Sequence, residues 1–207
     1  MLTRRQPRAT VIAFDGLVAD TLPARALAVS EAVTAEVGVC SSGEGLSLVQ
    51  GRSLDEAVEF ALRARVQSPA VEFDATVRDL AVLRARRSYS AMVAHGLSLH
   101  DGAIAWITAR VASHGPVVLR ADSVRRDVDQ LLAFTELAEV VTFIRCSDDL
   151  PRSFAAASTE CAWSAIVSRL AAKHVAPDEC VAMECSERSA AVARKFLPTV
   201  WVLHALT

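Results

Sequence analysis

The chain has 207 residues, of which 52% are hydrophobic and 22% are charged, so it can bury a sizeable core and is not intrinsically disordered. Its net charge of −2 and isoelectric point near 6.2 provide no basic surface for a phosphate backbone, which argues against a nucleic-acid partner. No stretch approaches 18 uninterrupted apolar residues, and the N-terminal apolar run has no signal-peptide cleavage site, so we expect neither a membrane span nor a signal peptide.

The five cysteines are odd in number and form no C-x-x-C pair, which argues against a disulfide framework and against a zinc knuckle. We expect reduced, mostly buried thiols in a cytoplasmic protein. The five histidines are scattered through the sequence without metal-ligand spacing, so they do not predict a metal centre.

The first predicted element is a buried strand that starts at Ala9. Its apolar, β-branched run ends abruptly in Asp15 and Gly16. This pattern is typical of a central strand that delivers a carboxylate to the C-terminal edge of a parallel sheet. We therefore expect a functional site at that edge.

Residues 20 to about 95 predict helices and no strand. The expected helices cover about 23–38, 54–65 and 71–95. Ser53 and Glu56 form a capping box at the start of the second helix. In the third helix, Leu80, Leu83 and Met92 are expected on the buried side.

From residue 96 onward, helix and strand patterns alternate, which is typical of a parallel, doubly wound sheet. The expected helices are 103–114, 123–134, 160–174 and 186–196. The expected strands are 116–119, 140–144, 180–183 and 199–203. The chain is therefore predicted to adopt an α/β fold.

The stretch from Ala9 to Thr21 resembles motif I of the haloacid dehalogenase (HAD) superfamily, in its β-phosphoglucomutase-like group. That motif has four apolar residues followed by D-x-D-G-x-x-x-D-T. Without a gap, Asp15, Gly16, Asp20 and Thr21 occupy its last four fixed positions, and Ala13 replaces the first aspartate, the family's nucleophile. A two-residue deletion would instead make Asp15 the nucleophile and lose the second aspartate. Either alignment removes one of the two catalytic carboxylates.

The resemblance extends over nearly the whole chain and implies a three-layer, HAD-like (Rossmann-like) parallel-sheet core with an inserted α-helical cap. Residues 1–20 and 96–207 would form the core, and residues 21–95 the cap. Within the cap, Arg52 lies in a G-R-S run like the one whose arginine faces the substrate's distal phosphate in the family. A solvated arginine at a helix start is the alternative interpretation of Arg52.

Two further motifs of the family are altered in the core. The Ser or Thr that ends motif II is replaced by Arg120, which we expect to pair with Asp15, Glu184 or Asp122. The lysine of motif III falls on Ala157. That lysine neutralises charge between the nucleophile and the phosphate, so its absence removes a source of transition-state stabilisation.

Motif IV is also altered. The family's E-D-S run provides a magnesium ligand at its aspartate, and here that residue is Cys185, which follows Glu184. A thiol is a poor ligand for a hard cation that prefers oxygen. With Ala13 in motif I, the site would keep the backbone carbonyl of Asp15 and little else for a metal ion.

These changes predict a catalytically degenerate HAD-like protein, a pseudophosphatase that acts as a binding, structural or regulatory component. No catalytic residue, metal or cofactor is expected to function in it, and a protein partner or self-association is expected. One alternative is an active phosphatase or phosphomutase with Asp15 as nucleophile and Mg²⁺ held by Asp15 and Glu184. Another is a sensor that holds a small phosphorylated metabolite through Asp15, Arg52 and Arg120.

Overall fold

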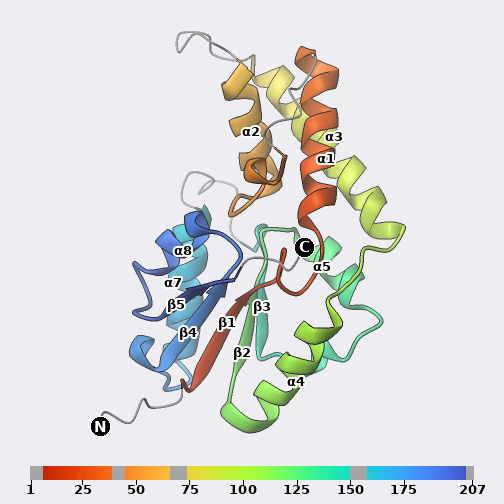
Figure 1. The fold of residues 1–207 in the computed structure, drawn as a ribbon. Coiled ribbons are helices and arrows are strands. Elements are labelled where there is room, and N and C mark those ends of the chain that lie inside the picture. The colour runs from red at the N-terminus through yellow and green to blue at the C-terminus, as the bar shows by residue number, and fades with distance from the viewer. Residues whose placement is uncertain (1–6, 39–44, 66–73, 150–157, 204–207) are drawn as a thin grey trace.

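The computed structural model describes residues 7–38, 45–65, 74–149 and 158–203, and these form one parallel sheet, helices on both of its faces and a helical layer above one edge (Figure 1). The strands, in the spatial order β3-β2-β1-β4-β5, are β1 (Ala9–Ala13), β2 (Val117–Arg120), β3 (Phe143–Arg145), β4 (Cys180–Glu184) and β5 (Val200–Val202). The helices are α1 (Leu22–Val37), α2 (Leu54–Arg65), α3 (Ala75–Ala94), α4 (Asp101–His114), α5 (Arg125–Leu132), α6 (Leu137–Val140), α7 (Ser158–Ala171) and α8 (Glu187–Ala193), with the 3-10 turns η1 (Gly45–Leu48) and η3 (Pro177–Glu179).

Strand β1 is the centre of the sheet. Ala13 pairs with Arg120 of β2, and Ile12 pairs with Met183 of β4. All five residues of β1 are buried, because helices cover both faces of the sheet. Since the strands are parallel, the C-terminal ends of β1, β2 and β4 meet at one edge, where ligands bind in open α/β sheets.

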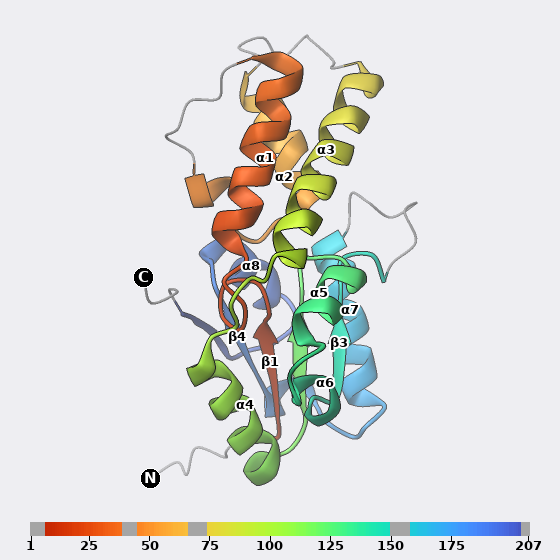
Figure 2. The same ribbon diagram turned by 90° about the vertical axis from the view of Figure 1, so that its right-hand side faces the viewer.

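Helices α7 and α8 cover one face of the sheet, and α4, α5 and α6 cover the other (Figures 1 and 2). On the α7 side, Trp163, Ile166 and Leu170 pack with Val11 and Val118. The opposite face of the same strands joins a second cluster, which continues into the helices above the sheet edge. The sheet is therefore buried from both sides, as its apolar strands predict.

Helices α1, α2 and α3 stand above the C-terminal edge of the sheet (Figure 2). The buried faces of α1 and α3 include alanines, Ala28 on α1 and Ala81 and Ala85 on α3, and small side chains let helices approach closely. The expectation that Leu80 and Leu83 face inward was wrong, because they are 43% and 44% exposed. The buried stripe of α3 instead runs through every fourth residue from Ala81 to Val93.

The predicted α/β fold class is confirmed, and each predicted helix and strand has a counterpart. The capping box forms, because the amide of Ser53 donates to Glu56 Oε2 (2.7 Å) and the amide of Glu56 donates to Ser53 Oγ (3.3 Å). The strand expected over 140–144 starts later in the structure, because Val140 is the last residue of helix α6 and β3 starts at Phe143. The boundaries 1–20, 21–95 and 96–207 remain predictions. Within the described ranges, no helix has the length and apolar character that crossing a bilayer requires.

Candidate functional site

The site begins at the end of the central strand. Strand β1 ends at Ala13, and the amide of Phe14 still donates to the carbonyl of Arg120 at 2.8 Å. The chain then leaves the sheet and turns at Gly16, whose φ of 85° is readily adopted by glycine. Asp15 therefore lies in the loop beyond the strand, with its side chain 1% exposed.

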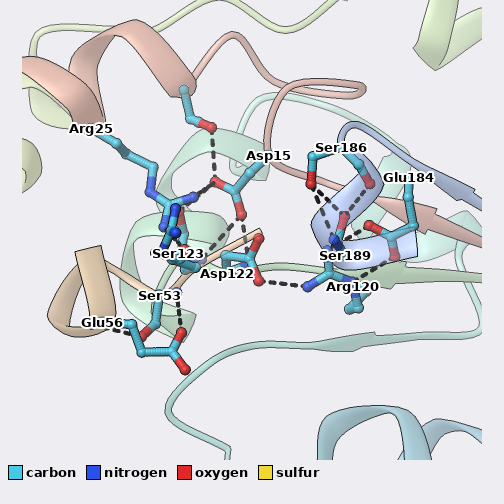
Figure 3. Close-up of polar contacts among 12 residues, drawn as sticks. Asp15, Arg25, Ser53, Glu56, Arg120, Asp122, Ser123, Glu184, Ser186 and Ser189 are labelled. Carbon is cyan, nitrogen blue, oxygen red and sulfur yellow. Dashed lines mark hydrogen bonds and ion pairs between the residues drawn. The ribbon is translucent and has the colours of Figure 1, made fainter. Parts of the chain in front are cut away.

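Four hydrogen bonds occupy the carboxylate of Asp15. Its Oδ1 accepts from Thr21 Oγ1 (2.8 Å) and from Ser123 Oγ (2.6 Å). Its Oδ2 accepts from the backbone amides of Asp122 (2.7 Å) and Ser123 (3.1 Å) (Figure 3). Oδ1 thus receives donors from the motif I segment and from the loop after β2, and Oδ2 receives both of its donors from the loop after β2.

A fully buried arginine of helix α1 adds a fifth interaction. Arg25 Nη1 lies 3.6 Å from Asp15 Oδ1, and Arg25 Nη2 donates to the backbone carbonyl of Arg52 at 2.5 Å. Burial alone raises the pKa of Asp15, but Arg25, the hydroxyls of Ser123 and Thr21 and the Asp122 amide outweigh it and lower that pKa overall. Asp15 is therefore an ionised structural anchor.

Arg120 lies beside this anchor and bridges two buried carboxylates. Its Nε and Nη2 donate to Glu184 Oε1 (2.9 Å) and Oε2 (2.7 Å), a bidentate arrangement, and its Nη1 donates to Asp122 Oδ1 (2.5 Å). The three residues are 2%, 0% and 6% exposed, respectively. Burial lowers the pKa of Arg120, but Asp122 and Glu184 raise it far more, so the guanidinium stays charged.

The pairing expected for Arg120 therefore forms with Glu184 and Asp122, and it does not extend directly to Asp15. The two clusters are connected through Asp122, whose side chain binds Arg120 while its amide binds Asp15 (Figure 3). The described residues thus contain one continuous polar network beneath the helical layer.

The described residues line a small cavity at this edge. The cavity there is lined by Ser53 and Glu56 of the helical layer and by Arg120, Asp122 and Ser147 of the sheet side, and its volume is about 20 Å³. A buried water needs roughly 10–15 Å³. The cavity can therefore accommodate about one water but not a phosphate ester in this conformation.

The other predicted site residues lie in different surroundings. The side chain of Arg52 stays within the helical layer, where it donates to the carbonyls of Ser47 (2.7 Å) and Leu48 (3.3 Å). Its guanidinium carbon lies 3.9 Å from the centre of the Phe60 ring. Ala157 lies outside the described residues. The structure does not bring Arg52 side-chain donors to Asp15; the Arg52 backbone carbonyl makes the connection through Arg25.

The residues at the edge do not fit a magnesium ion. Ala13 offers no side-chain oxygen, and both oxygens of Glu184 are bound to Arg120. Burial raises the pKa of the Cys185 thiol to about 12, so the sulfur stays protonated and is a poor ligand. No group of three or more His, Cys, Asp or Glu side chains in the described ranges is arranged to hold a metal.

The sequence interpretation did not single out Arg25 or Tyr89, both of which come from the helical layer and contact the site. The Tyr89 hydroxyl hydrogen-bonds Ser123 Oγ at 3.1 Å, and Ser90 Oγ donates to Asp127 at 2.9 Å. A signal was available for Arg25, because it shares the i, i+3, i+4 stripe of α1 with Ala28 and Val29. An arginine in such a stripe is buried and requires a partner.

No family model matches this chain, and no curated protein matches it by sequence. Solved structures do match it. A predicted phosphoglycolate phosphatase from Haemophilus somnus is 14% identical with a TM-score of 0.69, and 93% of this chain and 83% of that one are covered. CbbY from Rhodobacter sphaeroides, solved in complex with phosphate, is 18% identical with a TM-score of 0.67 and coverages of 91% and 82%.

A HAD hydrolase of family IA, variant 3, from Entamoeba histolytica is 19% identical, with a TM-score of 0.65 and coverages of 89% and 80%. At these identities the likeness establishes the fold and does not transfer an activity. The HAD-like fold that the motif I resemblance implies is thereby confirmed.

Proposed function

We propose that this chain, which has the fold of the HAD superfamily, no longer performs phosphoryl transfer and serves as a binding or regulatory component. The proposal rests on the environment of the Asp15 carboxylate, whose two oxygens accept four hydrogen bonds and which lies beside the buried Arg25. A nucleophile needs a lone pair directed at the substrate, and Asp15 has its lone pairs directed at protein donors.

Asp15 is equally unsuited to the role of general acid. A general acid must hold a proton near the working pH, so enzymes raise the pKa of such carboxyls. Burial pushes the pKa of Asp15 upward, but Arg25 and the hydrogen-bond donors lower it below its usual value. Asp15 is therefore ionised under physiological conditions, which argues against the role of general acid that the ungapped alignment would assign to it.

The end of the first strand supports the ungapped alignment. Strand β1 stops at Ala13, which is level with Arg120 across the sheet, whereas Asp15 lies in the loop. The position at the strand end, where the nucleophile of the family would stand, thus holds a methyl group. Arg120 faces two carboxylates that neutralise it, so it supplies no free cation for a phosphate in this conformation.

The comparisons favour the active alternative, because the similar structures carry names of phosphatases and hydrolases. That alternative would require Asp15 to release its present donors and Glu184 to release Arg120. The Rhodobacter sphaeroides protein was solved in complex with phosphate, and this favours the alternative in which the chain senses a small phosphorylated ligand. We also propose that the chain acts in the cytoplasm, where it binds a protein partner or a second copy of itself.

Hydrolysis assays test this proposal. Wild type, Asp15→Asn and Ala13→Asp are each incubated with p-nitrophenyl phosphate and with a panel of sugar phosphates in the presence of Mg²⁺, and circular dichroism verifies their folding. We expect all three to release phosphate at the background rate, because Ala13→Asp restores one group while Arg120 and Cys185 remain. Turnover by wild type that Asp15→Asn abolishes in a folded protein would establish the active alternative.

A further inference from the structure

A second cavity lies between edge strand β3 and helix α7, and Arg145 is among its lining residues. Figure 2 shows α7 beside β3, and the cavity between them has a volume of about 310 Å³. Ligand sites in proteins start at about this size, roughly 300 Å³. It shares no lining residue with the small cavity at the edge of the sheet.

Positive charge predominates in this cavity. Three arginines, Arg125, Arg145 and Arg169, line it together with a single carboxylate, that of Asp149. Asp149 Oδ2 already accepts from Arg125 Nη2 at 2.7 Å and lies 3.6 Å from Arg145 Nη1. One carboxylate against three guanidinium groups leaves two positive charges that the lining does not compensate.

Arg169 is the cation that is free to bind. Its guanidinium carbon lies 4.3 Å from the centre of the Phe143 ring, which positions it by a cation–π contact. In the part of the chain that the structure describes, Arg169 makes no hydrogen bond or ion pair. The sequence of residues 150–157, Leu-Pro-Arg-Ser-Phe-Ala-Ala-Ala, contains no acidic residue that could neutralise it.

The other neighbouring carboxylates are bound to Arg125 outside the cavity lining. Asp129 Oδ1 lies 3.9 Å from Arg125 Nη1, and Asp148 Oδ1 accepts from the Arg125 amide at 2.7 Å. Arg125 also donates to the carbonyl of Ile144, which fixes it at the strand edge. Arg125 is therefore held by the protein, Arg145 is held through Nη1, which donates to the carbonyl of Asp149 at 3.1 Å, and Arg169 keeps its donors for a ligand.

We propose that this cavity binds a small phosphate monoester, with the phosphoryl group on Arg169 and the organic part on the apolar side formed by Phe143 and Ile166. Arg169 has no carboxylate partner among the described residues, and arginine binds phosphate through paired N–H donors. The apolar lining, to which the partly exposed Ala165 also belongs, favours an organic substituent over inorganic phosphate alone. This proposal is independent of whether the Asp15 site is active.

Phenyl phosphate is the probe, titrated into ¹⁵N-labelled full-length protein at low ionic strength and followed by NMR. We expect saturable shift changes at the amides of Phe143, Ile166 and Arg169, with phenol and inorganic phosphate binding more weakly. Raising the salt concentration should weaken binding, since the cavity is open to solvent and its charges are screened.

Three variants locate the site. Arg169→Gln should weaken binding by roughly tenfold or more, as expected for a lost charge-assisted hydrogen bond. Ala165→Leu, which fills the cavity without changing charge, should also weaken it. Arg126→Gln removes an exposed arginine of α5 that does not line the cavity and should bind like wild type. Equal weakening in Arg169→Gln and Arg126→Gln, shifts centred on Ser53 and Ala121, or no binding at millimolar phenyl phosphate would overturn the proposal.

Discussion

The carboxylate of Asp15 and the guanidinium of Arg25 lie 3.6 Å apart, although Asp15 follows the central strand and Arg25 belongs to the helical layer above it. Both side chains are almost completely buried. Arg25 also holds the backbone carbonyl of Arg52, which precedes α2. The ion pair therefore ties two helical segments to the sheet at the position where a phosphatase of this fold would need access for its substrate.

The stability of the fold should depend on Arg120. In Arg120→Ala, the carboxylates of Glu184 and Asp122 remain buried without their cation, and breaking a buried pair in this way costs about 3–5 kcal/mol. Urea denaturation measures the free energy of unfolding. Arg78→Ala, which breaks an exposed ion pair with Asp79, is the matched control and should unfold like wild type. A loss below about 1 kcal/mol for Arg120→Ala would show that the network is not structurally important.

The pH dependence of stability should reveal the ionised Asp15. Because its pKa is lower in the folded chain than the ordinary value of 3.8, its contribution is complete above about pH 4 and is lost as the pH falls through the folded pKa. The difference in unfolding free energy between wild type and Asp15→Asn should thus stay constant from pH 7 to about pH 4 and narrow below.

Asp122 changes the pH dependence of stability in the opposite direction, because burial raises its pKa despite the attraction of Arg120. Asp122 is present in wild type and in Asp15→Asn, so its contribution largely cancels in the difference between their unfolding free energies. Asp79→Asn, at an exposed position, serves as control. If instead wild type gains stability relative to Asp15→Asn as the pH falls from 7 to 5, Asp15 has a raised pKa, as a general acid would.

Tyr89 gives an optical test of the contact between the helical layer and the sheet. It is the single tyrosine of the chain, and burial raises its pKa, with a further contribution from Asp15. A raised folded pKa means that stability is lost as the pH rises above the unfolded value of about 10. Absorbance at 295 nm should therefore show phenolate only as far-UV circular dichroism shows unfolding. Phenolate formation near pH 10 in folded protein would place Tyr89 in contact with solvent.

Magnesium should not stabilise the chain. A ligand raises the melting temperature only if it binds the native state, and the oxygens of Glu184 and Asp15 are bound to protein donors. Thermal unfolding with 10 mM MgCl₂ should match that in NaCl of equal ionic strength. An increase in melting temperature that is absent in Glu184→Gln would contradict this expectation.

The sequence predicted the fold because its local signals agree. The apolar run ending at Asp15, the capping box at Ser53 and the alternation of helix and strand after residue 96 all indicate the same α/β architecture. Motif spacing also brought Arg120 and Glu184 to one edge, since both end strands adjacent to β1.

The helical layer was harder to predict. Leucine is a stronger hydrophobic signal than alanine, so Leu80 and Leu83 were expected inside, whereas close packing of α1 and α3 uses Ala81 and Ala85. Arg25 was overlooked because arginine in a helix is usually solvated. The burial of Arg25 depends on its contact with Asp15, and only the tertiary fold brings the two side chains together.

We propose that Asp15 cannot attack a phosphoryl group, and a phosphorylation trap tests this directly. Wild type and Asp15→Asn are incubated with ³²P-labelled acetyl phosphate and Mg²⁺, quenched in acid, and examined for protein-bound label, which detects an acyl phosphate even when turnover is slow. We predict that neither protein retains label above that of a heat-denatured control. Label that approaches one phosphoryl group per chain in wild type and is absent from folded Asp15→Asn would contradict this claim.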